Sequence, residues 1–174
     1  ARYFNIQFKD TLDRWSVVQT DSFFRTPVPL AAFSADTTSF CDSGTVAFNN
    51  LSFDTDIYQW NFGDGNTSTD STPVHTYTTP GTYTVTLLAT DTLMNLQDDT
   101  VQAAFITVNV LPTVTASASD DTLCAGQSTT LSAGGNATGY SWSGGITNNQ
   151  SFVPGSSQMY VLTGSNGICS NQDS

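Results

Sequence analysis

The amino-acid sequence predicts an all-β protein of two tandem antiparallel β-sandwiches, preceded by an N-terminal strand or hairpin segment. Apolar residues recur at every second position in several short stretches, which is the spacing of half-buried strands. No long stretch repeats with the 3.6-residue period of a helix. The length of 174 residues allows one large sandwich or two small modules. An internal similarity favours two modules.

The clearest predicted strand covers residues 82–87, where Tyr83, Val85 and Leu87 share one face and threonines occupy the other. The same alternation occurs in four further stretches: Phe4/Ile6/Phe8, Tyr58/Trp60/Phe62, Ala104/Ile106/Val108/Val110 and Tyr140/Trp142. Clusters of Gly, Asn, Asp and Pro between these stretches indicate turns. Prolines near residues 28 and 112 mark breaks, so we expect three segments, 1–28, 29–111 and 112–174.

The internal similarity lies in a cysteine followed by a tryptophan. Trp60 comes 19 residues after Cys41, and Trp142 comes 18 residues after Cys124. An aromatic-bearing strand then follows each tryptophan. We therefore expect two diverged sandwiches of one general type.

The charge distribution excludes several classes of partner. All four basic residues lie in the first 25 positions, while the chain carries 15 acidic residues, all Asp, and a net charge of -11. Such a chain repels phosphate backbones and anionic membrane surfaces, so we expect no nucleic-acid binding. No apolar run approaches the length of a membrane span. The first residue is Ala and no basic-then-apolar signal segment precedes it, so we expect a mature or cut-out piece of a longer precursor.

Three motifs give the first module a family resemblance. They are YQWNFGDG at residues 58–65, PVHTY at 73–77 and PGTYTV at 80–85, and in this order they resemble the PKD (polycystic-kidney-disease) domain over about residues 29–110. Trp60 and Phe62 are expected in the core, with residues 63–65 forming a tight turn. Asp64 looks like an acid in a catalytic motif, but we expect it to bond the backbone amides of its own turn.

The second module is similar to the immunoglobulin-like modules that follow PKD domains in large surface and secreted proteins of gliding-type bacteria. The resemblance rests on residues 124–127, 140–143, 152–154 and 166–169. It implies a disulfide between Cys124 and Cys169, and therefore an oxidising, extracellular compartment. Cys41 is then expected to be an unpaired, buried thiol. The module is also expected to lack its last strand, because Ser174 follows soon after Cys169.

Calcium is the one cofactor that the PKD resemblance suggests. Asp54 and Asp56 correspond to an Asp-x-Asp loop with which some PKD domains bind Ca²⁺, and Asp91 corresponds to the acidic position that closes the site. Carboxylate oxygens suit this hard cation. Ile57 stands where the family usually has Gly. The alternative is that these aspartates lie in turns and are solvated.

A second signal is an Asp-(Ser/Thr)-apolar tripeptide that resembles the O-glycosylation acceptor of the same bacterial group. Composition alone gives about 1.7 occurrences, whereas the chain has six, so we expect glycans on a secreted surface. The alternative is that Asp and Thr both favour turns and strand starts. The acceptor positions are Thr11, Thr37, Ser71, Thr92, Thr100 and Thr122.

The residue types of the chain indicate that it is not an enzyme. It has one histidine, His75, no Glu, and no Lys or Arg after residue 25, which leaves no general base or phosphate clamp of recognisable type. The leading hypothesis is a non-catalytic structural or adhesive module of an extracellular surface protein, filament or appendage, acting through protein or glycan contacts. The alternative is an accessory binding region of a secreted protease or polysaccharide-degrading enzyme.

The chain ends suggest two further alternatives. The extended residues Phe4, Ile6 and Phe8 can fill the groove of a sandwich that lacks its last strand in another copy, which builds a fibre by strand donation. The other alternative is that these 174 residues are a window on a longer chain. In that case the missing strand lies further along the same chain.

Overall fold

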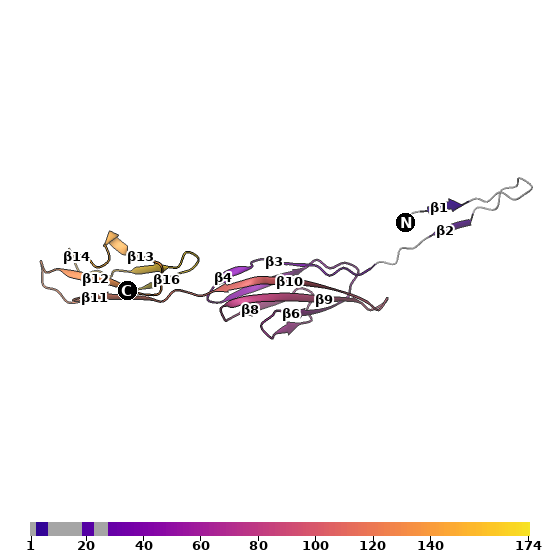
Figure 1. The fold of residues 1–174 in the computed structure, drawn as a ribbon, viewed down its shortest axis with the longest axis horizontal. Helices are drawn as coiled ribbons and strands as arrows, with labels where there is room; N and C mark the ends of the chain where they lie inside the picture. Colours follow the sequence, from indigo (N-terminus) through magenta and orange to yellow (C-terminus); the bar gives the residue numbers. More distant parts are fainter. Residues whose placement is uncertain (1–2, 7–18, 23–27) are drawn as a thin grey trace, which may run out of the picture.

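The computed structural model describes residues 3–6, 19–22 and 28–174. Over these residues the chain is all-β, as the sequence predicted, and its helical content is the short 3-10 helix η1 (Ser143–Gly145). Figure 1 shows two bundles of strands that follow one another along the long axis of the molecule, β3 to β10 in one and β11 to β16 in the other. No helix in this part of the chain is long and apolar enough to cross a membrane.

The first module is a sandwich of two sheets. One sheet has the order β3-β5-β8 and the other has the order β4-β10-β9-β6-β7. Neighbouring strands run antiparallel except β4 and β10, which are parallel. The bounds are β3 (Phe33–Ala35), β4 (Ser39–Cys41), β5 (Gly44–Asn50), β6 (Ile57–Asn61), β7 (Thr67–Ser68), β8 (Val74–Tyr77), β9 (Gly81–Asp91) and β10 (Leu96–Asn109).

The core of this module follows the alternation predicted for two of its strands. Trp60 and Phe62 are buried, as expected, and so are Val85 and Leu87 of β9, while Tyr83 is half-buried. Aromatic rings pack edge to face or tilted within this core. Its buried residues are Phe33, Val46, Phe48, Trp60, Phe62, Tyr77, Val85, Leu87, Ile106 and Val108.

Strand β10 follows its predicted alternation over only part of its length. Ile106 and Val108 face the core, but Ala104 is exposed and Val110 lies outside the strand. The register between β9 and β10 shifts between Gln102 and Ile106, and Ala104 has a positive φ of 51°. A β-bulge therefore turns the chain at this point and breaks the alternation.

The second module has two three-stranded sheets, β11-β12-β14 and β13-β15-β16. Its core is smaller, with Leu131, Trp142 and Leu162 buried at its centre. The predicted inward positions Tyr140 and Trp142 both contribute to it. The bounds are β11 (Val114–Ala118), β12 (Thr129–Gly135), β13 (Gly139–Trp142), β14 (Ser151–Phe152), β15 (Leu162–Ser165) and β16 (Ser170–Asp173).

The prediction that the second module lacks its last strand is wrong. Strand β16 begins directly after Cys169 and pairs antiparallel with the whole of β15. The Asp173 carboxylate accepts a hydrogen bond of 2.8 Å from the Ala116 amide, which ties β16 to β11 of the other sheet. Four residues are enough to form this strand because β15 itself is only four residues long.

At the N-terminal end, β1 (Tyr3–Ile6) pairs antiparallel with β2 (Gln19–Ser22). This pair agrees with the predicted strand or hairpin segment. Of the positions predicted for strand donation, Phe4 and Ile6 lie in β1, while Phe8 lies outside the described residues.

Candidate functional site

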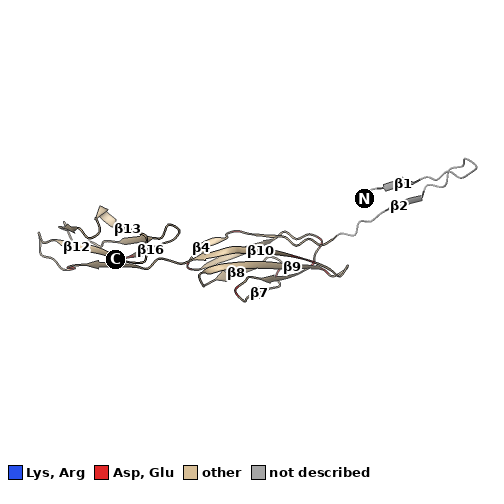
Figure 2. Cartoon of the chain, in the orientation of Figure 1, with Lys and Arg blue, Asp and Glu red and all other residues tan. Residues whose placement is uncertain are grey.

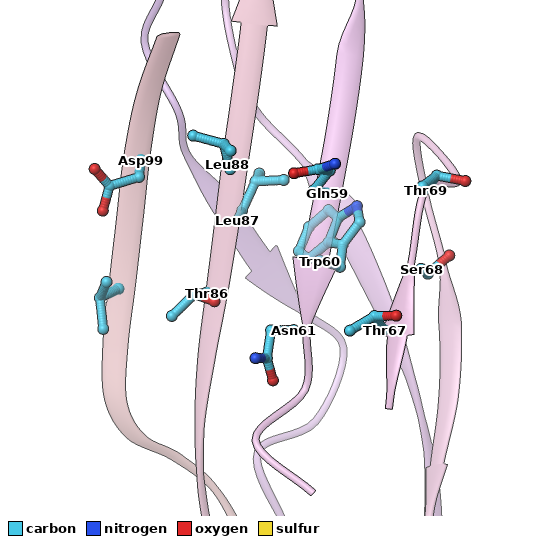
Figure 3. Close-up of a pocket in the computed structure, with 11 residues that line it drawn as sticks. Gln59, Trp60, Asn61, Thr67, Ser68, Thr69, Thr86, Leu87, Leu88 and Asp99 are labelled. Carbon is cyan, nitrogen blue, oxygen red and sulfur yellow. The ribbon is translucent and has the colours of Figure 1, made fainter. Parts of the chain in front are cut away.

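The outward face of the larger sheet of the first module forms a shallow groove of about 590 Å³ (Figure 3). Alternation along β6 and β9 sends Trp60 and Leu87 into the core and sends the residues beside them outward. We call this surface the outer sheet face. Besides Trp60 and Leu87, the residues that line it are Gln59, Asn61, Thr67, Ser68, Thr69, Thr86, Leu88, Asp99 and Val101.

The side chains of the outer sheet face are suited to hydrogen bonding and to apolar contact. It carries neutral amides and hydroxyls around the apolar Leu88 and Val101, with Asp99 as its only charged lining residue. No hydrogen bond joins the side chains of Gln59 or Thr86 to another described residue, so both can bond a ligand. The sequence analysis missed this surface because outward Thr, Asn and Gln on a strand carry no signal of their own.

A second groove, of about 830 Å³, lies at the end of the second module that is remote from the first. Segments 116–125 and 154–160 form its walls, and Leu131 and Trp142 line it between them. Cys124 and the paired acidic residues Asp120 and Asp121 stand at its edge. We call this surface the distal groove.

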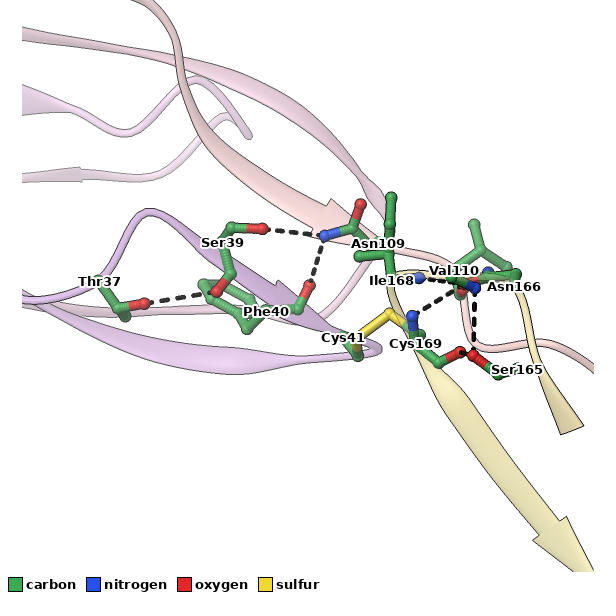
Figure 4. The surroundings of a disulfide bond; sticks show 11 residues. Thr37, Ser39, Phe40, Cys41, Asn109, Val110, Ser165, Asn166, Ile168 and Cys169 are labelled. Atoms are coloured by element: carbon green, nitrogen blue, oxygen red, sulfur yellow. Dashed lines mark hydrogen bonds between the residues drawn. A yellow bond between two sulfur atoms is a disulfide. The ribbon is translucent and has the colours of Figure 1, made fainter. Parts of the chain in front are cut away.

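The disulfide lies elsewhere than predicted. Cys41 at the end of β4 bonds Cys169 in the turn before β16, with a Cα–Cα distance of 5.9 Å, and Cys124 is free and exposed (Figure 4). The predicted Cys124–Cys169 bond and the predicted free Cys41 are therefore both wrong. The physical reason is that Cys124 and Cys169 lie at opposite ends of the second module, since β15 separates the distal groove from the turn that carries Cys169.

Asparagine side chains surround this bond and fix the junction of the two modules. The Asn166 Oδ1 accepts hydrogen bonds from the amides of Ile168 and Cys169, at 3.1 and 2.8 Å, which shapes the turn. The Asn166 Nδ2 donates to the Val110 carbonyl at 3.2 Å. The Asn171 Nδ2 donates to the Pro112 carbonyl at 3.1 Å. The linker between the modules is thus bonded to the second module on both sides of the disulfide.

Two of the three predicted calcium ligands accept hydrogen bonds from nearby residues. The Asp56 carboxylate accepts hydrogen bonds from the amide and the hydroxyl of Thr92, which lower its pKa. The Asp91 Oδ1 accepts hydrogen bonds from two amides of its own turn. No group of three or more His, Cys, Asp or Glu side chains in the described part of the chain is placed to hold a metal ion. Calcium binding by Asp54, Asp56 and Asp91 therefore stays a prediction.

Asp64 bonds the backbone of its own turn, as expected, and also binds His75. Its Oδ1 accepts from the Asn66 amide at 3.0 Å, and its Oδ2 accepts from His75 Nε2 at 2.7 Å. Burial raises the pKa of the Asp64 carboxyl, but the hydrogen bonds from His75 and Asn66 outweigh this and leave the pKa below its usual value. The His75 ring stacks on Phe62 at 4.2 Å, so the pair stiffens the turn.

Tyr77 packs beside His75 and bonds the same turn. Its hydroxyl is buried and donates to the Phe62 carbonyl at 3.0 Å. Burial, followed by the negative charge of Asp64, raises the pKa of this hydroxyl well above its usual value. A tyrosine held neutral in this way fastens β8 to the turn and offers no base for chemistry.

The predicted glycosylation positions lie in varied settings. Ser71, Thr92 and Thr122 are exposed, whereas Thr37 and Thr100 are half-buried. Three of the hydroxyls already donate hydrogen bonds: Thr37 to Ser39, Thr92 to Asp56 and Thr122 to Asp121. Thr11 lies outside the described residues. Modification of these positions stays a prediction.

Charge on the described residues has one sign. Figure 2 colours Lys and Arg blue, and none of the described residues is of either type. The Asp side chains are the only groups that are fully charged at neutral pH over this part of the chain, apart from chain ends. Both grooves are therefore better suited to neutral or basic partners than to anions.

Comparison with known proteins identifies one part of the chain. The family model for the PKD domain matches residues 26–105. A collagenase, ColA from Bacillus cereus, is 59% identical over 34 residues, which are 20% of this chain and 4% of that protein. The pre-pro-metalloprotease PrtV from Vibrio cholerae is 39% identical over 62 residues, which are 36% of this chain and 6% of that protein.

A solved structure is similar to about half of the chain. The crystal structure of the PKD1 domain from Vibrio cholerae metalloprotease PrtV has 34% sequence identity and a TM-score of 0.40, over 48% of this chain and 99% of that one. The chain thus spans a small fraction of the curated relatives that it matches.

Proposed function

Residues 26–105 are a PKD domain, and on this premise we propose that the chain is a non-catalytic accessory region of an extracellular hydrolase. A protease is the favoured kind of hydrolase. The observation that carries this proposal is that the sequence relatives are a collagenase and a metalloprotease, which this chain matches over only a short part of their length. A match to a small part of such proteins favours an accessory role over the earlier hypothesis of a filament or adhesin.

The outer sheet face is the proposed contact surface for a polypeptide substrate. Amide and hydroxyl side chains spaced along β6 and β9 can bond the backbone of an extended chain, and Val101, 56% exposed, offers it an apolar contact. The absence of Lys and Arg from the described residues favours neutral or basic polypeptides over anionic polymers.

An extracellular location supports the same proposal. The Cys41–Cys169 disulfide needs an oxidising compartment to form and persist. Glycans on the exposed members of the acceptor set, such as Ser71 and Thr122, fit such a surface.

The proposal is tested by binding of the purified chain to gelatin, a denatured and extended polypeptide. Val101→Glu adds a negative charge to the outer sheet face and is expected to weaken binding at least about tenfold, a change of about 1.4 kcal/mol. Val74→Glu is the matched control, because Val74 is 65% exposed on the other sheet of the same module. Equal binding by both variants would show that the outer sheet face is not the contact surface.

A second candidate function is assembly by strand addition, and the distal groove is the observation that favours it. In the second module the distal groove opens between residues 159–160 and 120–125, beside Ser174. The predicted donor is the segment of Phe4, Ile6 and Phe8 from another copy. Sedimentation at several protein concentrations tests it. Strand donation predicts polymers that grow with concentration and that Ile6→Asp abolishes. A monomer at all concentrations excludes strand donation.

A further inference from the structure

The Cys41–Cys169 disulfide joins two positions that are close to the two limits of the continuous described chain, residues 28–174. Only residues 28–40 precede Cys41 in this stretch, and only residues 170–174 follow Cys169. The sequence separation of the two cysteines is 128, so almost all of both modules lies between them. A covalent path from residue 28 to residue 174 therefore exists that avoids residues 42–168.

We propose that this disulfide is a covalent bypass. It carries tension between the two limits of the described chain around residues 42–168, and it keeps those limits joined after a single backbone cut anywhere in that stretch. The proposal rests on the proposed function, because an accessory region of an extracellular protease is exposed to cleavage and must still hold its neighbours together. The connectivity itself does not depend on which ligand the outer sheet face binds.

The short segments outside the bypass are held by contacts with the sandwich. Before Cys41, strand β3 pairs with β5 and β4 pairs with β10. The Ala31 amide also donates a hydrogen bond of 2.7 Å to Asp98 of β10. After Cys169, β16 pairs with β15. Tension thus enters the disulfide from β4 and leaves it into β16, which are edge strands that pair with β10 and β15.

The length that tension can release differs greatly between the two redox states. With the bond intact, only residues 28–41 and 169–174 can be pulled out, which is about 20 residues or about 70 Å of extended chain. With the bond reduced, all of residues 28–174 can be extended, to about 500 Å. The extended length between residues 28 and 174 is therefore about sevenfold smaller with the disulfide intact than with it reduced.

The bypassed stretch contains highly exposed loop residues. Leu93, in the turn between β9 and β10, is 89% exposed, and Met159, before β15, is 77% exposed. Exposed turns are preferred sites of proteolytic nicking. A nick at either one leaves both halves of the chain attached through Cys41 and Cys169.

The first experiment is single-molecule stretching with handles at residues 28 and 174. The chain between the handles should reach no more than about 70 Å in the unmodified protein and about 500 Å in Cys41→Ser. Cys124→Ser is the matched control, because it removes the free cysteine and should behave like the unmodified chain. Equal extension of the unmodified chain and Cys41→Ser overturns the proposal.

The second experiment needs no cysteine variant to fold. A recognition site for a specific protease is inserted after Leu93, and the cut chain is run on denaturing gels. Without reductant, we expect one full-length band. With a dithiol, which reduces the bond to two thiols and is itself oxidised, we expect two fragments. Two fragments without reductant overturn the proposal. Gelatin binding is measured separately, so loss of binding with an intact bypass contradicts only the proposed function.

Discussion

Replacing Cys169 with serine is expected to destabilise the second module and to leave the first module unchanged. Cys41 is fixed to the first module independently of the disulfide, because β4 pairs with β10 and the Asp42 amide donates to the Asn109 carbonyl at 2.9 Å. The bond therefore anchors the end of the second module that carries the turn between β15 and β16 to a folded neighbour. Loss of the bond frees that end when the second module unfolds.

The magnitude follows from the loop that the disulfide closes. Because Cys41 lies beside Asn109, unfolding of the second module with the bond intact leaves a closed loop from Asn109 to Cys169, roughly 60 residues. The chain-entropy estimate for such a loop is about 4 kcal/mol at 25 °C. A domain of this size has a total stability of only a few kcal/mol, so most of it depends on the bond.

The assay is urea unfolding followed by two-dimensional NMR, in which amide resonances of the two modules are observed separately. With a urea m-value of about 1 kcal/mol/M for a small module, Cys169→Ser should lower the midpoint of the second module by about 4 M, or unfold it without denaturant. The midpoint of the first module should not move.

Two results would refute this reasoning. A fall of less than about 1 M in the second module would mean that its own core, centred on Trp142, is sufficient. An equal fall in both modules would mean that they unfold as one unit. Cys124→Ser is the control and should change neither midpoint, because Cys124 forms no disulfide.

Three other changes have defined outcomes. Gly63→Ala puts a Cβ 2.4 Å from the Thr84 carbonyl oxygen at a φ of +83°, so the first module should lose at least about 2 kcal/mol in urea unfolding, and unchanged stability would contradict the turn geometry. The pKa of Asp64 is depressed on folding, so its contribution to the free energy of unfolding is present above about pH 4 and is lost as the pH falls through the folded value. Asp64→Asn should therefore reduce the loss of stability in acid, measured by unfolding at a series of pH values. An unchanged pH dependence would mean that the His75 contact is not formed in solution. A thiol reagent should label one cysteine per native chain, Cys124, and labelling of any other cysteine would contradict the disulfide.

The sequence was sufficient for the fold of the first module. Strand alternation placed Val85 and Leu87 in the core, and the GDG turn with its Asp64 hydrogen bonds is local, so neighbouring residues determine it. The bulge at Ala104 was not predictable from alternation, because the register of β10 against β9 depends on pairing across the sheet.

The contacts between the two modules could not be predicted from the sequence. Cysteine positions do not determine a pairing, and here the partner of Cys169 depends on how two sandwiches meet end to end. Asn166 and Asn171, which bond the linker carbonyls, look like ordinary turn residues in the sequence. The outer sheet face was missed for the same reason, since its groove exists only when β6, β7, β9 and β10 lie side by side.

The central claim, a non-catalytic region that binds a polypeptide, is tested most directly by incubating the purified chain with gelatin and measuring bound protein and released peptides together. The account predicts that the chain is retained on gelatin, that Val101→Glu weakens retention while Val74→Glu does not, and that no peptides are released. Peptide release that co-purifies with the chain, or a complete lack of retention, would contradict it.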